Sequence, residues 1–374
     1  MTVNPLIALG QLGQSPWYDF ITRDLLASGG LRRLIEDDGL RGMTSNPTIF
    51  EKAIAGSELY DHEILGLMSA GCSPAQIFEG LAVADVRAAC DAFAALYASS
   101  KGSDGLVSLE VSPTLAHDAA RTVAEAERLW QAVGRPNLMI KIPGTRAGLP
   151  AITRCLAAGI NVNVTLLFSV ARYQEVIDAF QTGLEQRAER NLSIRGIASV
   201  ASFFVSRVDT KVDAQLDRMI AGGTSHLARL RGQAAIANAC LAYQAFERSL
   251  AGPRWQRLAG LGAQPQRPLW ASTSTKDPAL SDVYYVERLV APWTVNTLPP
   301  DTFAAYRDHG RPEVRIHAGI TEAPATLQTL TDAGISLEVI TRELEDEGVA
   351  KFAASYTSLL AGIETKSGIL AGRA

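Results

Sequence analysis

Short apolar segments alternate with longer amphipathic segments along most of the chain. The short segments have the length of strands and end at polar, glycine or proline residues, whereas the longer ones repeat apolar residues at helical spacing. Strands are predicted over residues 15–20, 41–47, 105–111, 137–143, 159–169, 196–205, 268–273 and 287–292. Helices are predicted over residues 75–98, 115–133, 147–158, 170–189 and 208–221.

Strands that alternate with helices predict a parallel α/β sheet, and eight such strands favour closure into a barrel. We therefore predict a single (β/α)8 TIM-type barrel domain over residues 1–374. Helical insertions are expected over about 51–98 and 208–250, a surface loop over 251–268 and a C-terminal helical segment over about 301–365. An open doubly wound sheet is the alternative. No G-x-G-x-x-G motif follows a predicted strand, which counts against a dinucleotide-binding version.

Polar residues interrupt the predicted strands near their C-terminal ends. In an α/β barrel these ends meet on one face, where catalytic groups from different strands converge. The interrupting residues are Asp19, Thr44, Ser45, Asn46, Glu110, Lys141, Asn163, Thr165, Ser202 and Ser272. The alternative is structural: buried polar groups satisfied by hydrogen bonds, or a buried ion pair among the charged ones.

Lys141 is the most informative of these interruptions because it lies inside the apolar strand "NLMIKIP". The other lysines lie in loops, tails or polar helical segments. Burial favours the neutral form of an amine, and a neutral amine can attack a ketone carbonyl to form an imine. Glu110 and Asp19 are candidates for the proton transfers that this chemistry needs, and Asn46 and Asn163 for contacts with sugar hydroxyls.

Composition narrows the class of protein. Hydrophobic residues make up 47% of the chain and charged residues 20%, which is ordinary for a globular enzyme. The net charge of -4 provides no basic field for nucleic acid or for an anionic membrane. The four cysteines lie far apart and the five histidines form no compact motif, so we expect free thiols and no metal site. No segment resembles a signal peptide or a membrane span, and a cytoplasmic location is expected.

Several motifs together resemble the transaldolases of the pentose phosphate pathway, in their longer bacterial form. They are "GMTSNPTIF" (42–50), "LMIKIPGT" (138–145), "GINVNVTLLFS" (159–169), "SFFVSRVDTKVD" (202–213) and "LWASTSTKDP" (269–278). The resemblance implies an α/β barrel without metal or cofactor. It also implies transfer of a dihydroxyacetone unit, through a lysine Schiff base, from sedoheptulose 7-phosphate to glyceraldehyde 3-phosphate, with erythrose 4-phosphate and fructose 6-phosphate as products.

Carried over to this chain, the resemblance assigns catalytic roles first. Lys141 matches the imine-forming lysine, and Glu110 and Thr165 match the pair that positions the catalytic water. Asp19 matches the acid/base for the C4 hydroxyl, with Asp24 as a rival in the same segment.

The resemblance also implies a set of substrate contacts. Asn46 and Asn163, with Ser202, match the residues that hold the dihydroxyacetone hydroxyls, and Phe204 matches an aromatic wall. Arg207 matches a phosphate-binding arginine. Shorter members carry Ser-x-Arg after the seventh strand, a pattern absent here, so Ser272 and Lys276 are expected to share the phosphate with Arg207. Trp293 stands where an acidic residue is expected.

Three rival functions remain open. A related Schiff-base aldolase acting on fructose 6-phosphate would release its product without an acceptor, and a metal-dependent aldolase would need a ligand set that the sequence does not show. A non-catalytic sugar-phosphate-binding barrel would need Arg207 but not Lys141. Small sugar phosphates are the expected partners, and the sequence leaves both a monomer and a homodimer open.

Overall fold

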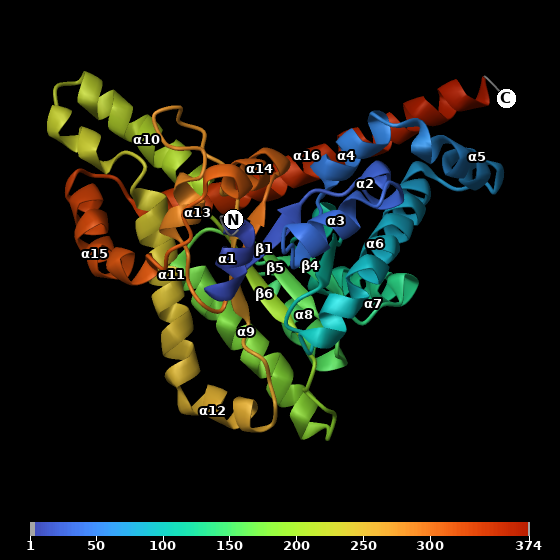
Figure 1. Cartoon of the computed structure of the whole chain (residues 1–374), viewed down its shortest axis with the longest axis horizontal. Helices are drawn as coiled ribbons and strands as arrows, with labels where there is room; N and C mark the ends of the chain where they lie inside the picture. The colour runs from blue at the N-terminus through green and yellow to red at the C-terminus, as the bar shows by residue number, and fades with distance from the viewer. Residues whose placement is uncertain (1–3, 373–374) are drawn as a thin grey trace.

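The strands form one closed, parallel barrel in chain order. A computed structural model describes residues 4–372, and each strand in it pairs with its neighbours in the sequence, with β8 returning to β1 (Figure 1). The strands are β1 (Gln14–Asp19), β2 (Gly42–Thr44), β3 (Leu106–Glu110), β4 (Leu138–Pro143), β5 (Val162–Leu167), β6 (Ser199–Phe204), β7 (Arg267–Ala271) and β8 (Thr294–Leu298). The predicted (β/α)8 barrel is confirmed, and the open sheet is excluded.

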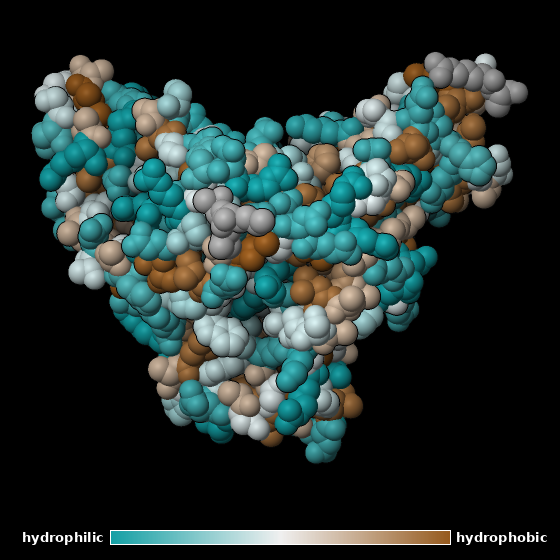
Figure 2. All heavy atoms as spheres, viewed as in Figure 1, coloured by the Kyte–Doolittle hydropathy of each residue, from teal (hydrophilic) through white to brown (hydrophobic). Residues whose placement is uncertain are grey.

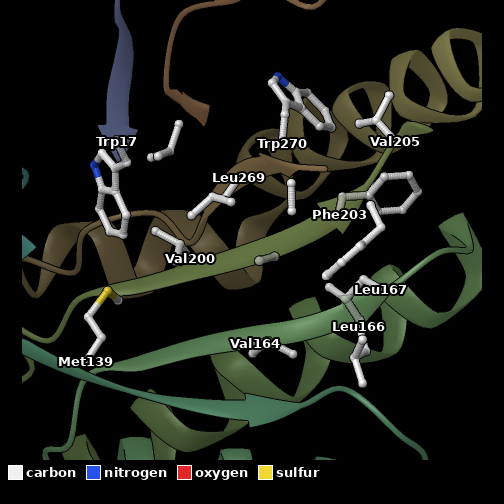
Figure 3. Packing of buried hydrophobic residues seen from close by; sticks show 14 of the residues in the cluster. Trp17, Met139, Val164, Leu166, Leu167, Val200, Phe203, Val205, Leu269 and Trp270 are labelled. Carbon is white, nitrogen blue, oxygen red and sulfur yellow. The ribbon is translucent and has the colours of Figure 1, made fainter. Parts of the chain in front are cut away.

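Burial explains the apolar character of the strands. All six residues of β4, β5 and β6 are buried, because helices cover the outside of the barrel and side chains fill its inside. Figure 3 shows part of this core, with Trp17 of β1, Met139 of β4 and Leu269 of β7 among the clustered side chains.

The prediction of the eighth strand at 287–292 was wrong. That segment begins at the end of helix α13 (Tyr284–Arg288), and the strand lies later, at Thr294–Leu298. Its sequence, TVNTL, lacks the apolar run that usually identifies a buried barrel strand. Its polar side chains are instead buried and hydrogen-bonded inside the barrel. Gln14 donates to Thr294 Oγ1 over 2.9 Å, and Thr273 donates to Asn296 Oδ1 over 2.9 Å.

The surface loop predicted over 251–268 was also wrong in part. Residues Pro253–Gly260 form helix α12, which begins with a proline in its first turn. Trp255 and Leu258 of this helix are buried, and the Trp255 ring stacks on Phe180 with 6.2 Å between centroids. Tertiary packing on helix α9 (Val170–Glu189) therefore stabilises a helix in a segment whose composition suggests a loop.

Helices surround the barrel and extend from it. The remaining helices are α1 (Pro5–Gln11), α2 (Arg23–Ala27), α3 (Gly30–Asp37), α4 (Pro47–Ala55), α5 (Asp61–Ser69), α6 (Pro74–Ser99), α7 (Ala119–Val133), α8 (Leu149–Ala158), α10 (Ser206–Ala221), α11 (Ala234–Ala251), α14 (Pro300–His309), α15 (Ile316–Asp332) and α16 (Leu337–Ala371), with short 3-10 turns η1 (Glu58–Tyr60), η2 (Pro113–Leu115) and η3 (Ser225–Leu230). Helices thus occupy most of the expected insertions and the C-terminal segment, while the single-domain division stays a prediction.

Helix α16 is the element that matters most for the barrel mouth. It spans 35 residues and packs on α4, α6 and α10 as well as on β5. Gly348 allows this close approach, since a Cβ there would lie 3.0 Å from the Leu166 side chain. Beyond the barrel, α16 projects beside α5, and the outline is notched between this arm and the one that carries α10 (Figures 1 and 2). Within residues 4–372 no helix is long and apolar enough to span a membrane.

Candidate functional site

The parallel register brings the charged strand residues together at the barrel mouth. Glu110 of β3 lies beside Lys141 of β4, Lys141 lies beside Asn163 of β5, and Asp19 of β1 lies beside Thr44 of β2. A cavity of ≈ 450 Å³, here called the mouth cavity, opens at this end of the strands. Nine of the eleven predicted site residues line it: Asp19, Asn46, Lys141, Thr165, Ser202, Phe204, Arg207, Ser272 and Lys276.

Lys141 is buried and held by two oxygen atoms. Its Nζ donates to Glu110 Oε2 and to the main-chain oxygen of Ser45, each over 3.2 Å. Only 5% of the residue is exposed, yet it lines the mouth cavity. An amine at the base of a cavity, beside a carboxylate that can exchange protons with it, has the arrangement needed to form an imine with a bound ketone.

Glu110 does not line the mouth cavity but lies directly behind Lys141. Burial raises the pKa of the Glu110 carboxyl, an effect that the neighbouring Lys141 opposes. Among the described residues, Glu110 Oε1 and Thr165 Oγ1 are buried without a hydrogen-bond partner. Because buried polar atoms are normally paired, both atoms are available to a water molecule or to a substrate hydroxyl.

Asp19 lies in the mouth cavity, whereas its rival Asp24 is exposed on α2 and does not line it. The Thr44 hydroxyl donates to Asp19 Oδ1 over 2.7 Å and lies 2.6 Å from the hydroxyl of Thr297. Burial raises the pKa of the Asp19 carboxyl, and Lys141 opposes this effect. Of the two rival carboxylates, only Asp19 therefore lies at this site.

The polar amide residues lie at two depths. Asn163 is fully buried; its amide donates to Ser108 Oγ over 3.0 Å, and its Oδ1 accepts from Ser202 Oγ over 2.7 Å. It therefore orients Ser202, which lines the cavity. Asn46 lines the cavity and also caps helix α4, because its Oδ1 accepts the Ile49 N–H over 3.0 Å.

Cations gather at the outer end of the mouth cavity. The Arg207 guanidinium, in the first turn of α10, lies 5.1 Å from the centroid of the Phe204 ring. Burial lowers the pKa of Arg207, and Asp19 opposes this effect. Ser272 shares a 2.9 Å hydrogen bond with Ser206, and the Lys276 ammonium donates to Ser274 over 2.8 Å. Such a group of donors suits an anion such as a phosphate.

Among the residues that line the mouth cavity but were not predicted from the sequence are two lysines and one phenylalanine next to the predicted groups: Lys52, Lys351 and Phe352. The Phe352 ring centroid, on α16, lies 5.5 Å from Lys141 Nζ and 6.0 Å from the Arg207 guanidinium carbon. Nothing in the sequence marks these residues, because a lysine and a phenylalanine at helical spacing are ordinary. The path of α16 across the barrel mouth brings Lys351 and Phe352 to the site, whereas Lys52 reaches it from α4.

Two residues at the site have a left-handed backbone that is uncommon outside glycine. Leu166, directly after Thr165, has φ 61°, and Ser272 has φ 57°. The pairing of β5 with β6 shifts register between Val164 and Leu167, as at a β-bulge. Each such conformation costs on the order of 1–3 kcal/mol and persists only where the surrounding packing holds it. Here the bulge directs Leu166 against Gly348 of α16.

The helix that carries Arg207 is anchored by a buried carboxyl. Asp209 Oδ1 accepts the Ala235 N–H over 2.7 Å, and its Oδ2 accepts the Tyr285 hydroxyl over 2.9 Å. Burial raises the pKa of Asp209 from 3.8 to about 7. The carboxyl joins α10 to α11 and α13, and so holds Arg207 at the mouth.

The raised pKa of Asp209 predicts that the stability of the protein depends on pH. Between pH 3.8 and about 7 the folded state keeps a proton on Asp209 that the unfolded state has released, so the free energy of unfolding falls as pH rises through this window. The loss amounts to about 4 kcal/mol at most. We expect Asp209→Asn to remove this contribution, which urea unfolding at several pH values measures. Asp217→Asn, on the exposed face of the same helix, is the control, and equal pH slopes in all three proteins would contradict the prediction.

Comparisons with known proteins agree with the arrangement of this site. Residues 16–363 match the family described as Transaldolase/Fructose-6-phosphate aldolase. The chain is 50% identical over 368 residues to a "Transaldolase" of Frankia alni, with 98% of each chain covered. It is 51% identical over 362 residues to a "Transaldolase" of Acidothermus cellulolyticus, with 96% of each covered. It is 46% identical over 378 residues to "Transaldolase 2" of a Nostoc species, with 99% of each covered.

Proposed function

The chain belongs to the transaldolase/fructose-6-phosphate aldolase family, and from this premise we propose that it is a transaldolase with Lys141 as its imine-forming residue. The proposed reaction moves a dihydroxyacetone unit from sedoheptulose 7-phosphate to glyceraldehyde 3-phosphate and leaves erythrose 4-phosphate and fructose 6-phosphate. The observation that carries the proposal is the buried Lys141 amine, 3.2 Å from the Glu110 carboxylate at the base of a cavity with a cationic outer end.

The first step forms the imine. Lys141 passes a proton to Glu110, its nitrogen attacks C2 of the ketose, and a second proton moves from this nitrogen to the former carbonyl oxygen. Glu110 then protonates this hydroxyl, which leaves as water, and the remaining iminium pairs with the Glu110 carboxylate. The raised pKa of Glu110, caused by burial, suits a residue that must give a proton and take it back. We assign Thr165, whose hydroxyl is unpaired among the described residues, to hold the water.

The second step breaks the bond between C3 and C4. Asp19 takes the proton of the C4 hydroxyl, C4 becomes the carbonyl carbon of the departing aldehyde, and the bonding electrons move to C3 and the iminium to give an enamine. Thr44 holds the Asp19 carboxylate for this step through its 2.7 Å hydrogen bond. The acceptor aldehyde then adds to C3, and its oxygen takes the proton back from Asp19. Water adds to C2 of the new imine, and the reverse of the first step frees the ketose and Lys141.

Binding groups divide between the two ends of the sugar. We assign Asn46 and Ser202, with Asn163 behind it, to the hydroxyls of the three-carbon unit, and Phe204 to the cavity wall. Arg207, Ser272 and Lys276 are assigned to the phosphate, since they lie at the cationic outer end. A cytoplasmic location is part of the proposal, and whether the protein is a monomer or a homodimer stays open.

One measurement distinguishes a transaldolase, which transfers the three-carbon unit, from an aldolase, which releases it. With fructose 6-phosphate alone we expect little free dihydroxyacetone, because Phe352 and Phe204 restrict water around the enamine. Adding erythrose 4-phosphate should produce sedoheptulose 7-phosphate at least about tenfold faster than free dihydroxyacetone appears without it, a gap of about 1.4 kcal/mol in barrier. Equal rates with and without the acceptor would identify a fructose-6-phosphate aldolase instead.

Phosphate recognition is tested through Arg207. We expect Arg207→Ala to raise KM for phosphorylated sugars by about 10- to 100-fold with a smaller change in kcat, because the lost contact is remote from the reacting carbons. The preference for fructose 6-phosphate over fructose should narrow by a similar factor. Arg218→Ala, at the exposed far end of the same helix, is the matched control. An unchanged preference in Arg207→Ala would show that the phosphate binds in another part of the cavity.

A further inference from the structure

Helix α16 brings a lysine to the end of the site where the sugar phosphate is expected. Lys351 lines the mouth cavity and also a second cavity of ≈ 620 Å³, which lies between α10, α16 and the segment after β7 and is here called the flank cavity. Four residues line both cavities: Arg207, Ser272, Lys276 and Lys351. The first three are already assigned to the phosphate, so Lys351 belongs to the same group by its position.

A sugar phosphate needs more positive charge than Arg207 supplies. A phosphate monoester carries a charge of about −1.5 to −2 at pH 7, whereas a guanidinium carries one positive charge. Among the described residues that line the mouth cavity, Asp19 is the one carboxylate, and its charge repels a phosphate. A further cation beside Arg207 therefore stabilises the bound dianion.

Lys52 also lines the mouth cavity, but it comes from the opposite side of the barrel. It lies on α4, which follows β2, whereas Arg207 lies on α10, which follows β6. These two strands are four places apart in a closed barrel of eight strands, so they face each other across it. Lys52 does not line the flank cavity either. It is therefore not placed to share a phosphate with Arg207.

The Lys351 ammonium is left without a partner because of an ion pair between α16 and α10. A glutamate four residues before a lysine normally pairs with it on a helix, and Glu347 holds that position. Glu347 instead pairs with Lys211 of α10 over 2.5 Å, and Lys211 also pairs with Glu343 over 2.6 Å. Within residues 4–372 Lys351 forms no ion pair or side-chain hydrogen bond, so its ammonium is available to a ligand.

The packing of α16 fixes the position from which Lys351 reaches the cavity. The next residue, Phe352, is buried, and its ring centroid lies 6.0 Å from the Arg207 guanidinium carbon. One turn later, Ser355 shares a 2.9 Å hydrogen bond with Thr48 of α4. Lys351 therefore extends from an anchored helix beside Arg207, and only its own side chain has to become ordered when an anion binds.

We propose that Lys351 binds the phosphate of the sugar together with Arg207. This inference rests on the proposed function and deepens it, because it adds a specificity-determining residue from outside the barrel. The phosphate then contacts α10 on one side and α16 on the other, and the helix that covers Lys141 with Phe352 also recognises the far end of the sugar.

Substitutions of Lys351 test this role. We expect Lys351→Met, which keeps the apolar stem of the side chain, to raise KM for fructose 6-phosphate about 3- to 10-fold with a smaller change in kcat, because the lost charge is remote from the reacting carbons. The preference for fructose 6-phosphate over fructose should narrow by a similar factor. Lys351→Arg keeps the charge and should restore most of the affinity.

Arg342→Met is the matched control, since it removes one positive charge from the exposed face of the same helix. Its KM should equal that of the unmodified protein. Calorimetry with fructose 6-phosphate measures Kd without turnover and should show the same loss of affinity in Lys351→Met. The difference between Lys351→Met and the unmodified protein should shrink as salt is added, because salt screens an exposed charge.

The outcomes distinguish this inference from the proposed function. Equal KM and equal Kd for fructose 6-phosphate in Lys351→Met and in the unmodified protein would overturn it. A loss of affinity that is as large for fructose as for fructose 6-phosphate, or that Lys351→Arg does not restore, would overturn it as well. If the unmodified protein bound fructose 6-phosphate but made no sedoheptulose 7-phosphate from it and erythrose 4-phosphate, the proposed function would fail, while Kd would still test Lys351.

Discussion

Lys141→Arg should abolish turnover and leave the protein folded. Arginine keeps a cation beside Glu110 and so preserves any structural ion pair, but a guanidinium stays protonated and cannot form the imine. We expect activity to fall by on the order of 10⁴-fold or more, as when other covalent nucleophiles are removed. Sodium borohydride added with fructose 6-phosphate should inactivate the unmodified protein and leave a reduced adduct on the peptide that contains Lys141.

A matched control is Lys211→Arg on α10, where the lysine pairs with Glu343 and Glu347 at the surface. It should remain active and should still be trapped by borohydride. Substantial activity in Lys141→Arg, or an adduct on another lysine, would show that Lys141 has a structural role and that the proposed mechanism is wrong. Binding of fructose 6-phosphate to Lys141→Arg, measured by calorimetry, separates lost chemistry from lost binding.

Asp19→Asn should stop carbon–carbon cleavage while imine formation continues. The asparagine keeps the size of the side chain and an oxygen for the Thr44 hydrogen bond, but it cannot take the C4 hydroxyl proton. We expect turnover to fall about 10²- to 10⁴-fold, the usual contribution of a general base. Borohydride should still trap the donor sugar on Lys141, now as an intact six-carbon adduct.

The rival carboxylate supplies the control for this second experiment. Asp24→Asn changes an exposed residue of α2 that does not line the mouth cavity, so activity should be unchanged. If Asp24→Asn is the inactive variant, the acid/base assignment moves to Asp24 and the cleavage step must be redrawn. If Asp19→Asn also loses trapping at Lys141, Asp19 acts on the lysine or on binding and not on the C4 hydroxyl.

Most of the site could be located from the sequence because its charged and polar residues interrupt strands that are otherwise apolar. A lysine inside "LMIKIP" or a glutamate at the end of "LVSLE" breaks an apolar pattern, and such breaks can be seen without coordinates. The parallel register then places Glu110 beside Lys141, a contact that follows from the predicted order of the strands. The same logic failed for β8, since Thr294 and Asn296 are polar, buried and paired across the barrel.

The alternation of strands and helices, the closed barrel and the reactive groups at the strand ends can all be derived from the sequence. They depend on local periodicity and on the rule that parallel strands end on one face. The elements that cover this face depend on long-range packing. Phe352 and Lys351 reach the mouth cavity because α16 crosses the barrel on the contact between Gly348 and Leu166. Long-range packing of this kind leaves no local pattern in the sequence. A residue at helical spacing has the same sequence pattern whether it covers a core or an active site.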